Sequence, residues 1–240
     1  MIEKRALGIF ENMSYKNETE ISRVTRSKEE AKSSYDRMSI WYDLITGRFE
    51  KKYRNIGLQK LNAKKRDVVL EIGFGTGQCI LALARSVGAS GKIYGIDISE
   101  GMYNIAQSKI EEEELSERVE LTCDDAVKLP FETEFFNAVF ISFTLELFDT
   151  PEIPTVLHEC YRVLRNGSRI CVVSLSKKKY TSMIRLYEWM HKKFPNYLDC
   201  RPIFVQDVLQ YTGFQILDVT ELSMFGLAVE IALGMKKSFE

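Results

Sequence analysis

The sequence has only two histidines, His158 and His191, among 240 residues. Neither has a second histidine or a cysteine at the spacing that zinc sites use, so the sequence predicts no metal centre. No nucleophile-elbow motif occurs, which argues against an α/β-hydrolase active site. We expect His158 to lie in a helix with a structural role, whereas His191 remains a candidate for a contact with substrate.

Cysteine pairs, excess charge and long apolar runs are also missing. The five cysteines show no paired spacing, which is typical of a reducing compartment, and we expect a cytoplasmic protein. A formal net charge of −1 predicts no general attraction to nucleic acid. No apolar run is long enough to cross a membrane, and the first residues lack the apolar core of a signal peptide.

Glycine is concentrated where the sequence is most informative, in residues 68–77. Val68 to Ile72 is a short apolar run typical of a buried parallel strand. Gly73, Gly75 and Gly77 follow at alternate positions, and a helical pattern begins at Gln78. A strand, a glycine turn and a helix form the first half of a nucleotide-binding βαβ unit, in which glycines let a ligand approach the backbone.

The spacing of these glycines distinguishes between a dinucleotide and another nucleotide-like ligand. A dinucleotide-binding fingerprint would place its third glycine at position 78, which is Gln78 here. An acid, Glu71, lies two residues before the first glycine. This pattern resembles motif I of class I S-adenosylmethionine (SAM) methyltransferases, and SAM carries no pyrophosphate that would need a helix N-terminus. The resemblance implies a SAM site at Glu71, Gly73, Gly75 and Gly77.

A second strand is expected to end at Asp97, 20 residues after Gly77. A carboxylate at this place can accept hydrogen bonds from both hydroxyls of a ribose, although a helix cap is the alternative role. Ser99 is predicted to cap the next helix. Ile98 and Met102 flank Asp97 in the chain and are further candidate cofactor contacts.

Two more strands complete the expected crevice. After a strand at 119–122, the resemblance implies that Asp125 and Ala126 bracket the adenine, with Asp124 as the alternative acid. The strand at 137–143 should end over the cofactor, because ligands lie where neighbouring parallel strands part. The candidate pocket residues at its end are Ser142, Phe143 and Thr144. The family usually has Phe-Asp before this strand, whereas this chain has Phe136-Asn137.

Residues 158–167 resemble the family run E-x-x-R-V-L-K-P-G-G, with Asn166 in place of the proline. They predict a helix that ends at Gly167 and a strand over 168–175. A short helix at 204–211 and strands at 214–219 and 228–233 would close the domain. The predicted fold class is α/β: a Rossmann-like class I methyltransferase fold. It has a seven-stranded, mostly parallel sheet with one antiparallel strand, and helices on both faces.

The N-terminal region narrows the resemblance to the ubiquinone/menaquinone-biosynthesis C-methyltransferases. Those enzymes often carry a Tyr-Asp pair that helps to close the cofactor site. Tyr42-Asp43 is the better match and Tyr35-Asp36 the alternative, so Tyr42 is a candidate cofactor contact, while a packing face is the other interpretation. The predicted organisation is a polar lead-in at 1–27, a helical lid at 28–61, and a methyltransferase domain at 62–240 with a substrate-region insertion at about 177–200.

The chemistry implied by SAM is an in-line displacement, which needs alignment of the acceptor and exclusion of water but no conspicuous catalytic motif. A base, if one is needed, is not identified; Tyr42, Asp43 and His191 are the alternatives. After the fourth strand, these relatives usually read Phe-Gly-Leu-Arg-Asn, whereas this chain has Phe143-Thr144-Leu145-Glu146-Leu147. The departure concerns the acceptor.

The acceptor is predicted to be small or lipid-like. The aromatic and methionine side chains of 180–194 suit an apolar pocket. The flanking lysines could meet an anionic membrane surface or an acidic head group, or be simply solvated: Lys177, Lys178, Lys179, Lys192 and Lys193. The resemblance implies ring C-methylation of a prenylated quinone-type precursor. A phospholipid or small-molecule N- or O-methyltransferase, and a SAM-binding module without turnover, are the alternatives; the oligomeric state is not predicted.

Overall fold

The computed structural model describes Val24, residues 29–30, 32–33 and 36, and two long stretches, 48–177 and 201–237. Tyr42, Asp43, His191 and the apolar segment at 180–194 lie outside these residues. Within the described part of the chain, no helix is long and apolar enough to cross a membrane.

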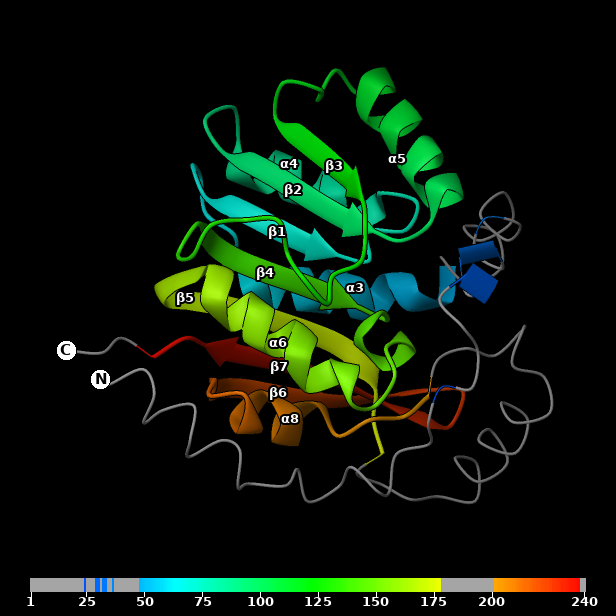
Figure 1. Ribbon diagram of the computed structural model, residues 1–240, viewed down its shortest axis with the longest axis vertical. Coiled ribbons are helices and arrows are strands. Elements are labelled where there is room, and N and C mark those ends of the chain that lie inside the picture. Colours follow the sequence, from blue (N-terminus) through cyan, green and yellow to red (C-terminus); the bar gives the residue numbers. More distant parts are fainter. Residues whose placement is uncertain are drawn as a thin grey trace.

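A seven-stranded sheet forms the centre of the protein, in the order β3-β2-β1-β4-β5-β7-β6 (Figure 1). Strand β7 runs antiparallel to both of its neighbours, and all other pairs are parallel. This confirms the predicted sheet. The strands are β1 (Val68–Ile72), β2 (Lys92–Asp97), β3 (Val119–Cys123), β4 (Phe136–Ser142), β5 (Leu164–Leu175), β6 (Gln215–Met224) and β7 (Leu227–Met235).

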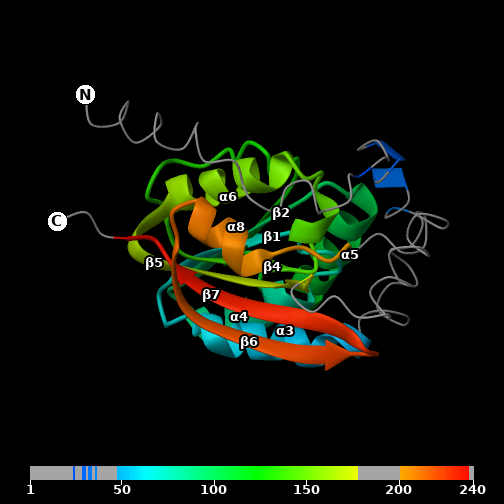
Figure 2. The ribbon, with the colours of Figure 1, turned by 90° about the horizontal axis from the view of Figure 1, so that it is seen from below.

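Helices cover both faces of the sheet. Figure 2 shows α6 and α8 on one side and α3 and α4 on the other. The helices of the two long stretches are α3 (Arg48–Leu61), α4 (Gln78–Val87), α5 (Glu100–Glu112), the short 3-10 helix η3 (Leu145–Leu147), α6 (Glu152–Val163) and α8 (Val205–Tyr211).

The strand sequences explain this layering. On β4, Ala138 and Phe140 pack with residues of α3, α4 and α5, whereas Val139 and Ile141 pack with residues of α6 and α8. Successive side chains of a strand point to opposite faces, so a continuous apolar run fills two cores. At the start of this strand, the Asn137 side chain accepts a 2.8 Å hydrogen bond from the Val68 N–H. The amide therefore joins β4 to β1 where the family usually has an acid.

Helix α3 belongs to the layer that covers the sheet. Tyr53 and Leu61 are buried in the core, and a Cβ added at Gly57 would come within 2.5 Å of Val173 on β5. A glycine is needed here because the helix lies directly on the strand. The lid predicted at 28–61 thus includes a helix of the core layer, and the closing role is proposed below for the residues before α3.

The end of α6 differs from the prediction. The helix stops at Val163 and not at Gly167, and β5 begins at once with Leu164. Leu164 pairs with Phe136 of β4, and Gly167 N–H donates to the Lys236 carbonyl. The sequence pattern assigns residues 164–167 to the end of the helix, but Leu164 and Gly167 form backbone contacts with neighbouring parts of the sheet and belong to β5. Gly167 has φ +73 and lies within β5.

Candidate active site

A cavity of about 400 Å³ opens at the carboxyl ends of β1, β2 and β4. The chain leaves β1 toward β2 and later returns to β4 on the other side of β1, so the connections diverge here, as they do at ligand crevices of α/β sheets. Most of the predicted cofactor contacts line this cavity: Glu71, Gly73, Gly75, Asp97, Ile98, Met102, Asp125, Ala126, Ser142 and Phe143.

The three glycines of the turn have different tasks. A Cβ at Gly73 would lie 2.2 Å from the Thr144 side chain, so this glycine lets β1 approach the loop after β4. Gly75 has φ +52 and no atom within 4 Å of an added Cβ, because it faces the cavity. Gly77 does not line the cavity; its added Cβ would lie 3.0 Å from Ala106, so it allows α4 to pack against α5.

Asp97 connects the glycine turn with the start of α5. Its Oδ2 accepts a hydrogen bond of 2.8 Å from Gly75 N–H, and its Oδ1 accepts one of 3.0 Å from Ser99 N–H. Burial raises the pKa of the Asp97 carboxyl, and backbone donors of Ser99, Gly75 and Ile98 oppose that shift. Ser99 caps α5 as predicted, since its Oγ accepts from Met102 N–H at 3.1 Å. Asp97 is therefore held rigidly at the cavity wall.

The acids after β3 also reach the cavity. Asp124 and Asp125 both line it, beside the buried Ala126. Asp125 Oδ1 accepts from Val127 N–H at 3.0 Å, and Asp124 Oδ1 accepts from Asp125 N–H at 2.7 Å. Each acid thus serves its own turn, and the choice between them stays open.

Two ionisable residues of α3 that the motifs did not predict, Glu50 and Arg54, line the cavity together with Glu71. Glu71 is 2% exposed, and its Oε2 has no hydrogen-bond partner among the described residues. Burial raises the pKa of Glu71 well above its usual value, and the nearby Arg54 opposes the shift. Arg54 pairs with Glu50 at 3.1 Å, and burial raises the pKa of Glu50 to about 7. The sequence signal that could have identified Glu50 and Arg54 was their i, i+4 spacing, since such a charged pair on the buried side of a helix is unusual.

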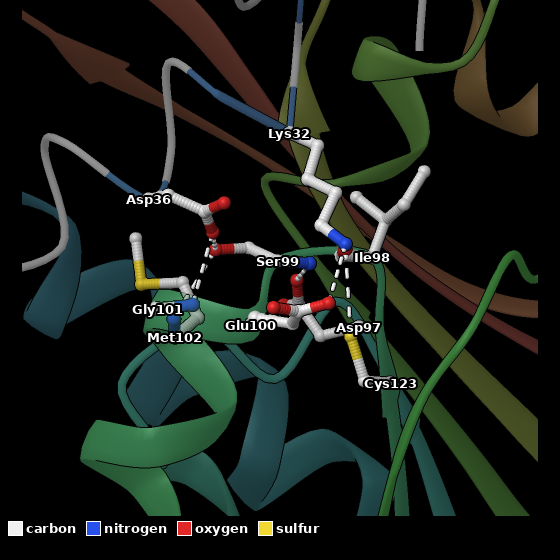
Figure 3. A network of polar contacts seen from close by, with 9 residues as sticks. All are labelled: Lys32, Asp36, Asp97, Ile98, Ser99, Glu100, Gly101, Met102 and Cys123. Atoms are coloured by element: carbon white, nitrogen blue, oxygen red, sulfur yellow. Dashed lines mark hydrogen bonds and ion pairs between the residues drawn. The ribbon is translucent and has the colours of Figure 1, made fainter. Parts of the chain in front are cut away.

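Lys32 and Asp36, which precede α3 in the chain, contact the N-terminus of α5 (Figure 3). Asp36 Oδ1 accepts from Ser99 Oγ at 2.6 Å and from Gly101 N–H at 2.9 Å. Lys32 pairs with Glu100 at 2.7 Å. A carboxylate is favourable here because the first N–H groups of a helix lack partners. The acid of the alternative Tyr-Asp pair therefore stands beside the cavity wall formed by Asp97 and Met102.

The loop after β4 forms the other rim and is held by a buried arginine. Leu147, Phe148 and Asp149 line the cavity. Arg201 is 1% exposed and donates to Thr150 Oγ1 at 2.7 Å and to the Phe148 carbonyl. Val24 N–H donates to Asp149 Oδ1 at 3.0 Å. Val24 and Arg201, which are far apart in the chain, thus contact the same loop.

Comparison with known proteins agrees with this geometry. The profile of the ubiE/COQ5 methyltransferase family matches residues 13–212. The chain belongs to this family. A demethylmenaquinone methyltransferase of Lactobacillus johnsonii is 29% identical over 222 residues, covering 85% of this chain and 88% of that protein. One from Geobacillus sp. is 32% identical over 165 residues, covering 69% of this chain and 68% of that protein.

Solved structures show the same fold at lower identity. The cyclase SpnF has a TM-score of 0.73 and 18% identity, covering 89% of this chain and 98% of that chain. A SAM dependent methyltransferase from Aquifex aeolicus has a TM-score of 0.59 and 21% identity, covering 88% and 100%. The family membership makes this chain a SAM-dependent methyltransferase, whereas the fold by itself carries other chemistry as well.

Proposed function

We propose that the cavity holds SAM and that the enzyme methylates a ring carbon of a quinone-type precursor. The single observation that supports this substrate class is the similarity to a demethylmenaquinone methyltransferase over 85% of the chain. The prenylated form of the acceptor and contact with a membrane surface are part of the proposal. The sequence run Lys177-Lys178-Lys179 suits contact with an anionic surface.

The cavity offers a distinct chemistry to each part of SAM. Asp97 can receive the ribose hydroxyls, because it lines the cavity and a carboxylate can accept more hydrogen bonds than its backbone donors supply. Asp125 or Asp124 would meet the adenine amine beside Ala126. Glu71 and Arg54 would suit the ammonium and the carboxylate of the methionine part. Bound SAM supplies an activated methyl group, so the protein has to orient the acceptor and exclude water.

Replacement of Asp97 by alanine is expected to weaken S-adenosylhomocysteine binding by about 1–3 kcal/mol, because the ribose loses a charged hydrogen-bond partner. Titration calorimetry measures this loss. Since Asp97 also braces Gly75, thermal unfolding of the unliganded variant is the control for a disordered turn. Unchanged affinity in the Asp97→Ala protein would refute the ribose role.

The segment before α3 is proposed to close over bound SAM, because Asp36 and Val24 fasten it to two sides of the cavity. Hydrogen exchange in residues 28–47 should slow when S-adenosylhomocysteine binds. An Asp36→Asn variant should lose most of this protection, since a neutral side chain is a weaker acceptor for the Gly101 N–H. Protection confined to residues 70–130 would contradict the closure.

The acceptor is tested with labelled SAM offered to demethylated quinone precursors, phospholipid vesicles and protein extract in parallel. We expect label in the quinone ring only. Label in phospholipid would favour the N-methyltransferase alternative, and label in protein would exclude both. A thermal shift with NAD but not with SAM would end the assignment of the cavity to SAM.

A further inference from the structure

An exposed aromatic residue occupies a strained turn at the end of β6. Phe225 is 72% exposed and has φ +51, and Gly226 follows with φ +83. Met224 pairs with Leu227, so these two residues form the whole turn between β6 and β7. Such turns favour Asn-Gly, because a bulky side chain at positive φ is strained. A large ring that is kept strained and in water points to a task for the ring itself.

A second exposed ring stands beside it. Phe49, near the start of α3, is 52% exposed, and its ring centroid lies 5.0 Å from that of Phe225 in an edge-to-face arrangement. Tyr53 donates a 2.6 Å hydrogen bond to the Ser223 carbonyl and so fixes the β6–β7 turn to α3. Phe49 and Phe225, here called the aromatic tip, therefore form a rigid unit built from two distant parts of the chain.

The aromatic tip lies at the same edge of the sheet as the cavity. Strand β6 runs parallel to β1 and β4, because β7 is antiparallel to both β5 and β6. The end of β6 is thus at the edge where those strands end, and its arrowhead points toward the β6–β7 turn in Figure 2. The residue after Phe49 is Glu50, which lines the cavity. A surface that receives the tip would also face the cavity.

The surroundings of the tip favour a lipid surface. Lys51 and Lys52 follow Phe49 on α3 and are exposed, while Met224 and Leu227 are half-buried under the turn. Aromatic rings with adjacent lysines suit the boundary between acyl chains and anionic head groups. Two rings offer far less than the roughly 800 Å² per partner that stable protein interfaces bury. Insertion into a bilayer requires no such area.

We propose that the aromatic tip inserts into an anionic lipid surface and presents the cavity to an acceptor held there. The inference rests on the proposed function in that a prenylated acceptor resides in a membrane. Lipid binding by the tip is nevertheless measurable without any methyl transfer.

The test is cosedimentation of the full chain with phosphatidylglycerol–phosphatidylcholine vesicles. The double variant Phe49→Ala/Phe225→Asn should partition at least about 10-fold more weakly, since it removes two rings from the bilayer. Asn-Gly fits the turn, so the fold should be kept. The matched control is Leu217→Asn, which removes a side chain that is 45% exposed near the opposite end of β6 and should not change partitioning.

The outcomes distinguish a failure of the proposed lipid binding from a failure of the proposed methyl transfer. Equal partitioning of the double variant and the wild type would refute lipid insertion by the aromatic tip. A wild type that does not bind these vesicles would refute it as well. Self-association without lipid that the double variant abolishes would assign the tip to a second copy and also overturn the proposal. Normal vesicle binding without methyl transfer to any quinone-type acceptor would instead refute the proposed function. Retained transfer to a water-soluble short-chain acceptor by the double variant supports the tip.

Discussion

A Gly75→Val variant is expected to fold and to lose SAM binding by at least about 100-fold, because its side chain would occupy the cavity. The added Cβ meets no protein atom within 4 Å, so the cost to folding is limited to the backbone strain at φ +52. That strain is about 1–2 kcal/mol for a residue with a Cβ. Titration with S-adenosylhomocysteine and urea unfolding measure the two effects separately.

Gly213→Val is the matched control for this variant. Gly213 has φ +95, has only ordinary contacts around an added Cβ, and does not line the cavity. It should be destabilised to a similar extent and keep its affinity for SAM. Equal loss of affinity in both variants would mean that backbone strain, and not the occupied cavity, abolishes binding. Gly73→Val should behave differently again and fail to fold, because its Cβ would overlap Thr144.

The second large effect is expected at Glu146, which stands where the related enzymes usually have arginine. Glu146 is fully buried, and its Oε2 has no hydrogen-bond partner among the described residues. Its Oε1 accepts from Leu175 N–H at 3.3 Å. Burial raises the pKa of Glu146 from 4.5 to about 8, and the hydrogen bonds only partly oppose it. The side chain is therefore protonated in the folded enzyme at neutral pH.

This shift sets the sign of the pH dependence. Below about pH 4.5 the folded and unfolded chains both carry the proton. Between about pH 4.5 and 8 only the folded chain keeps it, so the free energy of unfolding falls as pH rises, by about 1.4 kcal/mol per pH unit. Glu146→Gln stays neutral and removes this loss. We expect the variant to lie within about 1 kcal/mol of the wild type near pH 5 and to be about 3–5 kcal/mol more stable at pH 8–9.

Urea unfolding from pH 5 to 9 measures the effect. The buried Glu71 and Glu50 should leave part of the pH slope in the Glu146→Gln protein, because burial raises the pKa of each. Glu120→Gln, an exposed change on β3, is the control and should leave the slope unaltered. A Glu146→Gln protein with the slope of the wild type would show that Glu146 is ionised in the folded state.

The family and the sheet followed from the sequence because their signals are local, and most of the residues predicted to contact SAM line one cavity. A strand, a glycine turn and a helix are adjacent in the chain around Gly75, and Asp97 ends the next strand. The apolar run of β1 and the glycine motif after it both predict a buried strand at the same residues. The departure at Glu146 was equally visible, although its burial and raised pKa were not.

Other features were decided by tertiary structure, because periodicity reports which side chains are buried but not what they meet. Asp36 accepts a hydrogen bond from Ser99, 63 residues away in the chain. Helix α6 stops at Val163 because the following residues pair with β4 and with Lys236, just after β7. Gly77 was predicted to contact the ligand, but it does not line the cavity, and its missing side chain lets α4 pack against α5. Arg54 and Glu71 join one wall of the cavity, and Phe49 meets Phe225, only because α3 lies across the sheet. Contacts between such distant residues are fixed by the packing of layers, which no single stretch of sequence encodes.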